Sequence, residues 1–278
     1  MKPVVGVIAP GAMGSAVAKR LVEKGLEVST VLEGRSPESA KRAKAAGMTG
    51  VGFAEIAGAD IILSIVPPGE ALGLAQRLAP AMTAAKRKPV YIDCNAVSPK
   101  TVASIARVVA ATGAHFVDAG IIGGPPKPDY AGPVFYLSGE HAREAMVLAD
   151  FGLQLRVLDG GIGTASALKM SYGGITKGLT ALASALILAA SRADVGPALH
   201  RELKESQPQL LAWFERQVPS MYAKAYRWVA EMEEVSEFAS EDAAAHEMFQ
   251  SCAALYTRLA KDFADEKTEI DMLSVFFK

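Results

Sequence analysis

Residues 4–14 read V-V-G-V-I-A-P-G-A-M-G. The apolar and small residues at 4–8 predict a strand buried on both faces, and residues 11–24 predict the helix that follows it. The turn between them is a G-x-G-x-x-G fingerprint with Ala9 in the first glycine position. In such a turn the glycines allow close backbone approach to a pyrophosphate and close packing of helix on strand, while the first N–H groups of the helix face the phosphates. The stretch therefore predicts a dinucleotide site, with an ordinary glycine-rich turn as the alternative; its residues are Gly11, Ala12, Met13 and Gly14.

The rest of the first half continues this alternation of strands and helices. Strand patterns at 26–32, 60–66 and 89–93 alternate with helical patterns at 36–46, 69–79 and 98–110, and further strands are expected at 114–118, 134–138 and 153–158. This order is typical of an α/β fold with a Rossmann-type, doubly wound parallel sheet. From Gly160-Gly161-Ile162-Gly163 onward every pattern is helical. We therefore expect an NAD(P)-binding domain at 1–162 and an all-helical substrate and dimerisation domain at 163–278.

The end of the second strand carries the residues that select between NAD and NADP. Glu33 could accept hydrogen bonds from an adenosine ribose, which favours NAD, whereas Arg35 and Ser36 could hold a 2′-phosphate, which favours NADP. Side chains alternate along a strand, so only one of Glu33 and Gly34 points at the ribose, while Arg35 and Ser36 open a helix and form an anion site. NADP is the expected cofactor, and NAD is the alternative.

Four further segments follow predicted strands or begin the second half, at the edge where open α/β sheets bind ligands. They are Ile65-Val66-Pro67-Pro68, Asp93-Cys94-Asn95-Ala96-Val97-Ser98-Pro99, Asp118-Ala119-Gly120-Ile121-Ile122-Gly123-Gly124, and the run from Gly161 to Gly174 that contains Lys169. Together they resemble the β-hydroxyacid dehydrogenase superfamily, which includes 3-hydroxyisobutyrate and 6-phosphogluconate dehydrogenases and the imine reductases. Residues 224–234, K-A-Y-R-W-V-A-E-M-E-E, resemble a branch with an uncharacterised 6-phosphogluconate-dehydrogenase-like C-terminal domain.

The resemblance implies roles for these residues. It makes Lys169 the catalytic lysine, and it makes Asn95 a catalytic residue that also contacts the cofactor. It gives the backbone N–H groups of Gly123 and Gly124 to the substrate carboxylate. The remaining implied contacts are Val66 and Pro67 with the cofactor, and Asp118 and Ile122 with the substrate.

Helical spacing adds candidates beyond Lys169. Gly173 and Lys177 follow it at intervals of four, so all three point broadly from one helix face. Gly173 either leaves room for a ligand or marks a close helix crossing, and Lys177 either binds substrate or packs its stem against apolar surface. Tyr172 and Arg227 are further substrate-contact candidates, although Arg227 also has the spacing for a helix salt bridge with Glu231.

The departures from the family pattern bear on the substrate. Tyr172 and Gly173 stand where the family has asparagine, Thr176 stands where 6-phosphogluconate dehydrogenases have glutamate, and Ile122 stands where the family has serine. Each change removes a polar contact to a hydroxylated substrate, so we expect a small hydroxy, keto or semialdehyde carboxylic acid less polar than a sugar acid. Decarboxylation has weak support, because no glutamate stands ready to protonate the enol, and it stays open. The alternatives are an imine or ketone reductase and a non-catalytic, nucleotide-binding redox sensor.

Composition limits the partners. With 29 Lys and Arg against 30 Asp and Glu, the net charge of −1 gives no general attraction for nucleic acid. Two cysteines and the lack of an apolar leader predict a cytoplasmic location. No metal site is expected, because the glutamates at 231 and 234 lack a histidine at ligand spacing and the four histidines are scattered along the chain.

The mean hydropathy of +0.21 is high for a chain with 7% aromatic residues. Residues 180–190 are apolar on every side of a helix but too few to span a bilayer, so this helix should be buried in protein rather than in a membrane. A helix that needs apolar neighbours all round predicts a homodimer formed through the C-terminal helices.

Overall fold

The computed structural model describes residues 2–127, 129–130 and 132–278. The chain divides into two compact units, Met1–Met170 and Ser171–Lys278. The predicted boundary at 162/163 falls just before helix α6 (Thr164–Arg192), whereas the two units meet within that helix. The first turns of α6 therefore belong to the sheet unit, which brings Lys169 into that unit.

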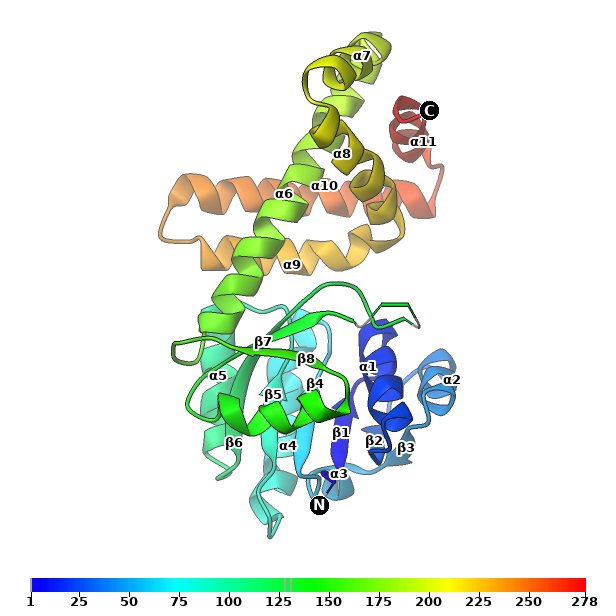
Figure 1. Ribbon diagram of the computed structural model, residues 1–278. Coiled ribbons are helices and arrows are strands. Elements are labelled where there is room, and N and C mark those ends of the chain that lie inside the picture. The colour runs from blue at the N-terminus through cyan, green and yellow to red at the C-terminus, as the bar shows by residue number, and fades with distance from the viewer. Residues whose placement is uncertain (1, 128, 131) are drawn as a thin grey trace. The chain divides into compact units, whose positions relative to one another are not determined.

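The first unit is built on one eight-stranded sheet in the order β3-β2-β1-β4-β5-β6-β7-β8 (Figure 1). The first six strands are parallel, β7 runs antiparallel to β6, and β8 runs parallel to β7. The order of strands β1 to β6 is that of the Rossmann fold, as predicted. The strands are β1 (Val5–Ile8), β2 (Val28–Val31), β3 (Thr49–Val51), β4 (Ile61–Ser64), β5 (Val90–Asp93), β6 (His115–Ile122), β7 (Val134–Ser138) and β8 (Gln154–Val157).

Helices bury apolar side chains on both faces of this sheet. One apolar layer contains Val17 of α1 and Leu148 of η2, and the other contains Leu74 of α4 and Val102 of α5. Two covered faces explain why the strands β1 and β4 are buried at every residue. The helices are α1 (Ala12–Glu23), α2 (Pro37–Ala45), α3 (Phe53–Ile56), η1 (Pro68–Glu70), α4 (Ala71–Ala84), α5 (Pro99–Ala110) and η2 (Ala142–Phe151).

The structure differs from the sequence pattern at short or irregular elements. The patterns do not predict β3, α3 or the 3₁₀ helix η2, and β6 extends past its predicted end at 118. Helix α4 continues across Pro80, where the pattern predicts its end, because the proline lies on the exposed side of the helix.

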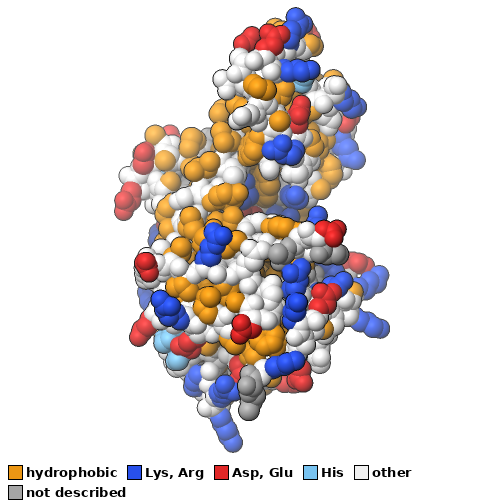
Figure 2. All heavy atoms as spheres, in the orientation of Figure 1, with side chains coloured by type: hydrophobic (Ala, Val, Ile, Leu, Met, Phe, Trp, Pro, Cys, Tyr) orange, Lys and Arg blue, Asp and Glu red, His pale blue; other side chains and the backbone are white. Residues whose placement is uncertain are grey.

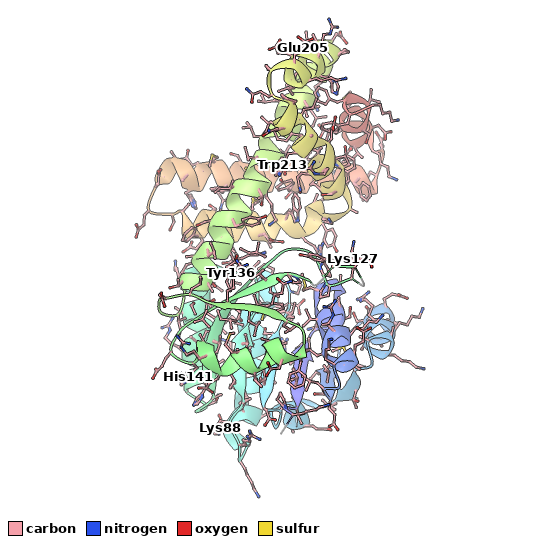
Figure 3. All side chains as sticks on the ribbon, viewed as in Figure 1. Lys88, Lys127, Tyr136, His141, Glu205 and Trp213 are labelled. Atoms are coloured by element: carbon pink, nitrogen blue, oxygen red, sulfur yellow. The ribbon has the colours of Figure 1, made fainter. Side chains whose placement is uncertain are left out.

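The second unit is helical throughout the part that the structure describes, as expected. Helices α9 and α10 pack against each other as a long antiparallel pair. Figure 3 places Glu205 on α7 and Trp213 on α8, which follow α6 in the chain. The remaining elements are α7 (Gly196–Ser206), α8 (Pro208–Met221), η3 (Tyr222–Lys224), α9 (Ala225–Phe238), α10 (Ala243–Ala264) and α11 (Thr268–Phe276).

Candidate functional site

The turn between β1 and α1 has the geometry that a pyrophosphate needs. A Cβ at Gly14 would lie 2.1 Å from the carbonyl oxygen of Ala9, so only glycine allows this close packing of helix on strand. A Cβ at Gly11 would have no heavy atom within 4 Å, so the backbone is open to a ligand there. Helix α1 begins with no side-chain cap and no acidic residue in its first turn, which leaves its dipole available to an anion.

A pocket of about 390 Å³ lies beside this turn, at the carboxyl ends of β1 and β2. Arg35 and Glu33, the two side chains considered as cofactor contacts in the sequence, line it. The guanidinium of Arg35 also lies 3.1 Å from the carboxylate of Glu70. Ser36 instead caps α2, where its Oγ accepts a hydrogen bond from the backbone N–H of Ser39. Sequence patterns did not identify three other lining residues, which come from separate elements: Phe53, Glu70 and Arg77.

Asn95 is buried and holds together the loops that follow β4 and β5. Its Oδ1 accepts a 2.7 Å hydrogen bond from the backbone N–H of Val66, and its Nδ2 donates to Ser64 Oγ and Asp93 Oδ2, each at 2.9 Å. The amide is thus occupied by protein partners, and Asn95 acts here as a brace between the ends of β4 and β5. Val66 is 9% exposed, whereas Pro67 is exposed at the start of η1.

Asp93 is the buried acid of this network. Burial raises the pKa of Asp93 to about 7, although hydrogen bonds from the backbone and side chain of Asn95 oppose the increase; the nearby charge of Asp118 adds to it. The sequence placed Asp93 at the end of a predicted strand but did not single it out, because its hydrogen bond with Asn95 and its closeness to Asp118 are visible only in the fold.

Asp118 does not have the position of a substrate contact. It is fully buried, and its Oδ2 accepts hydrogen bonds from the backbone N–H groups of Gly163, Ala165 and Ser166 at 2.9–3.1 Å. Its Oδ1 accepts a 2.6 Å bond from Ser166 Oγ. The expected substrate role is corrected accordingly: the carboxylate caps the N-terminus of α6, because backbone donors there attract an anion.

Lys169 follows on the same helix and reaches the end of β6. Its Nζ donates a 2.6 Å hydrogen bond to the carbonyl oxygen of Ile121. A Cβ at Gly120 would lie 2.7 Å from the carbonyl oxygen of Ala165 and 3.1 Å from the Cβ of Lys169, so glycine permits this close approach of strand and helix. No sequence pattern signals that role of Gly120, since the contact joins residues far apart in the chain.

The loop next to Lys169 contains the residues expected to hold a carboxylate. Ile122 is half-buried, and Gly123 and Gly124 are exposed directly after it. A Cβ at Gly124 would meet no atom within 4 Å. An ammonium group, an open glycine and an apolar side chain therefore lie together at the carboxyl end of one strand.

The other candidates belong to the second unit. Tyr172 is 50% exposed, and Gly173 is buried with a Cβ position 3.5 Å from Lys177 Nζ. The close helix crossing considered for Gly173 instead occurs at Gly174, where a Cβ would lie 3.0 Å from Val235.

The two cationic candidates in this unit, Lys177 and Arg227, contact other protein groups. Lys177 Nζ lies 2.8 Å from the Glu231 carboxylate and 5.5 Å from the centre of the Trp228 ring. Arg227, at 5.9 Å, lies over the ring of Tyr226. Both contacts fit a packing role for these cations in this structure; a substrate role stays a prediction.

Two family models match the chain. The NAD binding domain of 6-phosphogluconate dehydrogenase matches residues 4–149, and a domain of unknown function matches residues 190–259. The boundaries of the two matches agree with a nucleotide-binding unit followed by a separate helical unit.

Several known proteins are similar over most of the chain. An uncharacterised 28.5 kDa protein of Methanothermus fervidus is 29% identical over 205 residues, which are 73% of this chain and 77% of that protein. A conserved protein of unknown function, whose structure was described as similar to 3-hydroxyacid dehydrogenases, is 31% identical with a TM-score of 0.71 and coverage of 94% and 97%.

Two further structures share the fold. The 3-hydroxyisobutyrate dehydrogenase of Mycobacterium tuberculosis, in complex with L-serine, is 17% identical with a TM-score of 0.74 and coverage of 95% and 96%. An imine reductase of Myxococcus stipitatus in complex with NADP⁺ is 18% identical with a TM-score of 0.56 and coverage of 99% and 100%.

Proposed function

Because the chain belongs to the family defined by the NAD-binding domain of 6-phosphogluconate dehydrogenase, we propose that it is an NADP-dependent oxidoreductase acting on a small hydroxy, keto or semialdehyde carboxylic acid. The single observation that carries the proposal is the position of Lys169, hydrogen-bonded to Ile121 beside the exposed Gly123-Gly124 loop. A proton carrier and a carboxylate-binding backbone are the two groups that this reaction needs from the protein.

The residues present fit a dinucleotide. Gly11 and the uncapped N-terminus of α1 suit its pyrophosphate, and the pocket lined by Arg35 and Arg77 suits its adenosine end. When bound, the nicotinamide supplies the hydride acceptor or donor. We favour NADP because two arginines line this pocket, although Glu33 and Glu70 line it too and keep NAD as the alternative.

The protein's own part in the reaction is proton transfer and orientation. In oxidation Lys169 Nζ accepts the substrate hydroxyl proton, and in reduction it returns a proton to the same oxygen. The backbone N–H groups of Gly123 and Gly124 orient the carboxylate, while Ile122 presents an apolar surface to the rest of a small substrate. Asn95 holds the loops after β4 and β5 in place through its hydrogen bonds, and these loops would face the cofactor.

The test is a screen of hydroxyacids, aldehyde acids and imines by nicotinamide absorbance, with NAD and NADP and with the Lys169→Ala variant. We expect turnover of a carboxylic acid, a lower KM for NADP than for NAD, and a loss in Lys169→Ala of about 10²- to 10⁴-fold in kcat with cofactor binding retained. Lys19→Ala, an exposed lysine on α1, is the matched control.

Other outcomes separate the alternatives. An unchanged rate in Lys169→Ala on an accepted substrate would exclude the lysine as proton carrier. Turnover of imines but not of acids would favour the imine reductase alternative, which is supported by the fold shared with that enzyme. Cofactor binding without turnover of any compound would favour the redox sensor.

A further inference from the structure

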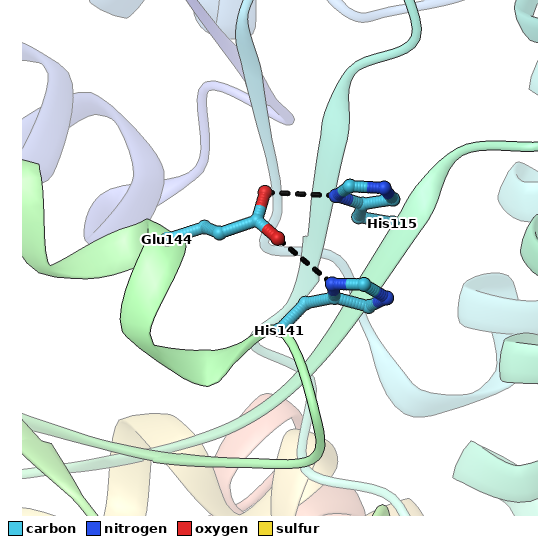
Figure 4. A group of neighbouring side chains, drawn as sticks. All are labelled: His115, His141 and Glu144. Carbon is cyan, nitrogen blue, oxygen red and sulfur yellow. Dashed lines mark hydrogen bonds and ion pairs between the residues drawn. The ribbon is translucent and has the colours of Figure 1, made fainter.

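Two histidines and a glutamate that are distant in the sequence meet on the surface of the sheet unit. His115 begins β6, His141 directly precedes η2, and Glu144 lies in the first turn of η2. Each histidine Nδ1 lies 2.8 Å from a different oxygen of the Glu144 carboxylate (Figure 4). One ligand atom from each residue lies within 4.8 Å of the others. The fold thus assembles a group that the scattered histidine positions did not predict.

The chemistry of the group is that of a metal site. Two imidazole nitrogens and one carboxylate oxygen are a ligand set that Zn²⁺ accepts, with the fourth position left to water. Each oxygen of the Glu144 carboxylate already contacts one of the two histidines, so the three side chains meet at one place.

The side chains have room for the rearrangement that binding requires. The two rings stack with centroids 3.9 Å apart and planes 9° from parallel. Their ring nitrogens therefore point in parallel directions and do not converge on one point. A metal in the plane of both rings requires the rings to rotate apart and to release the Nδ1 protons. The side chains of His115, His141 and Glu144 are 48%, 30% and 40% exposed, which leaves space for that rotation.

We propose that His115, His141 and Glu144 form a surface site for a divalent cation of the zinc class, which ties η2 to the start of β6. The site is independent of the proposed redox function. His115 lies at the amino end of β6, whereas Ile121 and the Gly123-Gly124 loop lie at the carboxyl end of the same strand. Figure 3 likewise shows His141 apart from Lys127, which follows that loop.

The experiment is a calorimetric titration of the chelator-treated, full-length protein with ZnCl₂, repeated with Co²⁺ to read the ligand-field absorption. We expect one zinc per chain and a four-coordinate cobalt spectrum. His141→Gln and Glu144→Gln should each weaken zinc binding by at least about tenfold, since loss of outer-shell partners alone has effects of that size. Glu140→Gln, an exposed carboxylate beside the site, and His200→Gln in the second unit should leave binding unchanged.

A second measurement keeps the test decisive if a variant folds poorly. Zinc should raise the Tm of the wild-type protein and of Glu140→Gln, and it should not raise the Tm of His141→Gln. No zinc binding by the wild-type protein, or equal binding in His141→Gln and Glu144→Gln, would overturn the proposal and identify at most adventitious surface binding.

Discussion

Lys169 owes its position to two residues that carry no chemistry of their own. Gly120 lets α6 approach β6 closely, and the Ile121 carbonyl accepts the lysine's hydrogen bond. The sequence identified the lysine through its resemblance to a family, and it identified Gly14 through a local fingerprint. Gly120, Arg77 and Asp93 were not predictable, because their roles depend on contacts between residues that only the folded chain brings together.

Asp93 gives a prediction at this scale. Its pKa is raised from 3.8 to about 7 in the folded protein, so the folded state binds a proton more tightly than the unfolded chain. The resulting stabilisation is full below about pH 4 and is lost as pH rises through about 7. Between pH 5 and pH 8 this group alone should lower the free energy of unfolding by about 3 kcal/mol.

Urea unfolding at the two pH values measures the effect. In Asp93→Asn the group cannot ionise, so the free energy of unfolding should decline less between pH 5 and pH 8 than in the wild-type protein. Asp150→Asn, at an exposed position, should keep the wild-type dependence. Identical pH dependence in Asp93→Asn and wild type would contradict an ionisation near pH 7 at this site.

At the scale of elements, the patterns predicted the long and regular ones. Short apolar runs predicted the parallel strands of the sheet core, and the helical patterns after Gly163 predicted that residues 180–190 of α6 are helical. The helix α3 was missed because four residues are too few for a helical period to stand out. The helix η2 was missed because a 3₁₀ helix has about 3 residues per turn, not the 3.6-residue period of an α-helix. Caps were missed for another reason: the carboxylate that starts α6 comes from β6, far upstream in the chain.

This long-range cap gives the second prediction. Asp118→Ala removes the buried acceptor of three backbone N–H groups at the start of α6, those of Gly163, Ala165 and Ser166, so the free energy of unfolding should decrease by about 3 kcal/mol. Asp118→Asn keeps an acceptor oxygen but loses the charge, so it should lower the free energy of unfolding by about 1 kcal/mol, the size of the effect of a charge at a helix terminus. Urea denaturation checks both, with exposed Asp159→Asn as control. Unchanged stability in Asp118→Ala, together with a raised KM for substrate, would restore the substrate role.

At the scale of the whole molecule, the apolar helix α6 is only partly covered within one chain. Ile175, Leu179, Leu182 and Leu186, spaced by three or four, are 65%, 39%, 57% and 58% exposed. Figure 2 shows hydrophobic side chains gathered along the course of this helix. A groove of about 700 Å³ continues this face onto α10, where Met248 is 55% exposed. Such a continuous apolar face marks an interaction surface.

A second copy of the chain is the expected cover. By length and composition α6 could also cross a membrane, and 44% of its most apolar stretch is buried. That helix, however, has Lys169 and Lys177 near its start, and Lys177 is paired with Glu231. A helix with such polar contacts packs against protein more readily than against lipid.

The last prediction tests that dimer. Burying a large apolar side chain contributes about 1.5–3 kcal/mol, so at half exposure Leu182 and Leu186 should each contribute about 1 kcal/mol or more, and twice that when both copies are counted. Leu182→Lys with Leu186→Lys should therefore raise the dimer dissociation constant by at least 100-fold, since about 1.4 kcal/mol is tenfold. Sedimentation at micromolar concentration should find a dimer for the wild-type protein and for Val275→Lys, which alters an exposed residue of α11, and a monomer for the double variant. A monomeric wild-type protein would contradict the prediction. If the protein could be recovered only with detergent or membranes, lipid rather than a second copy would cover the apolar face, because then no second copy is needed to cover it.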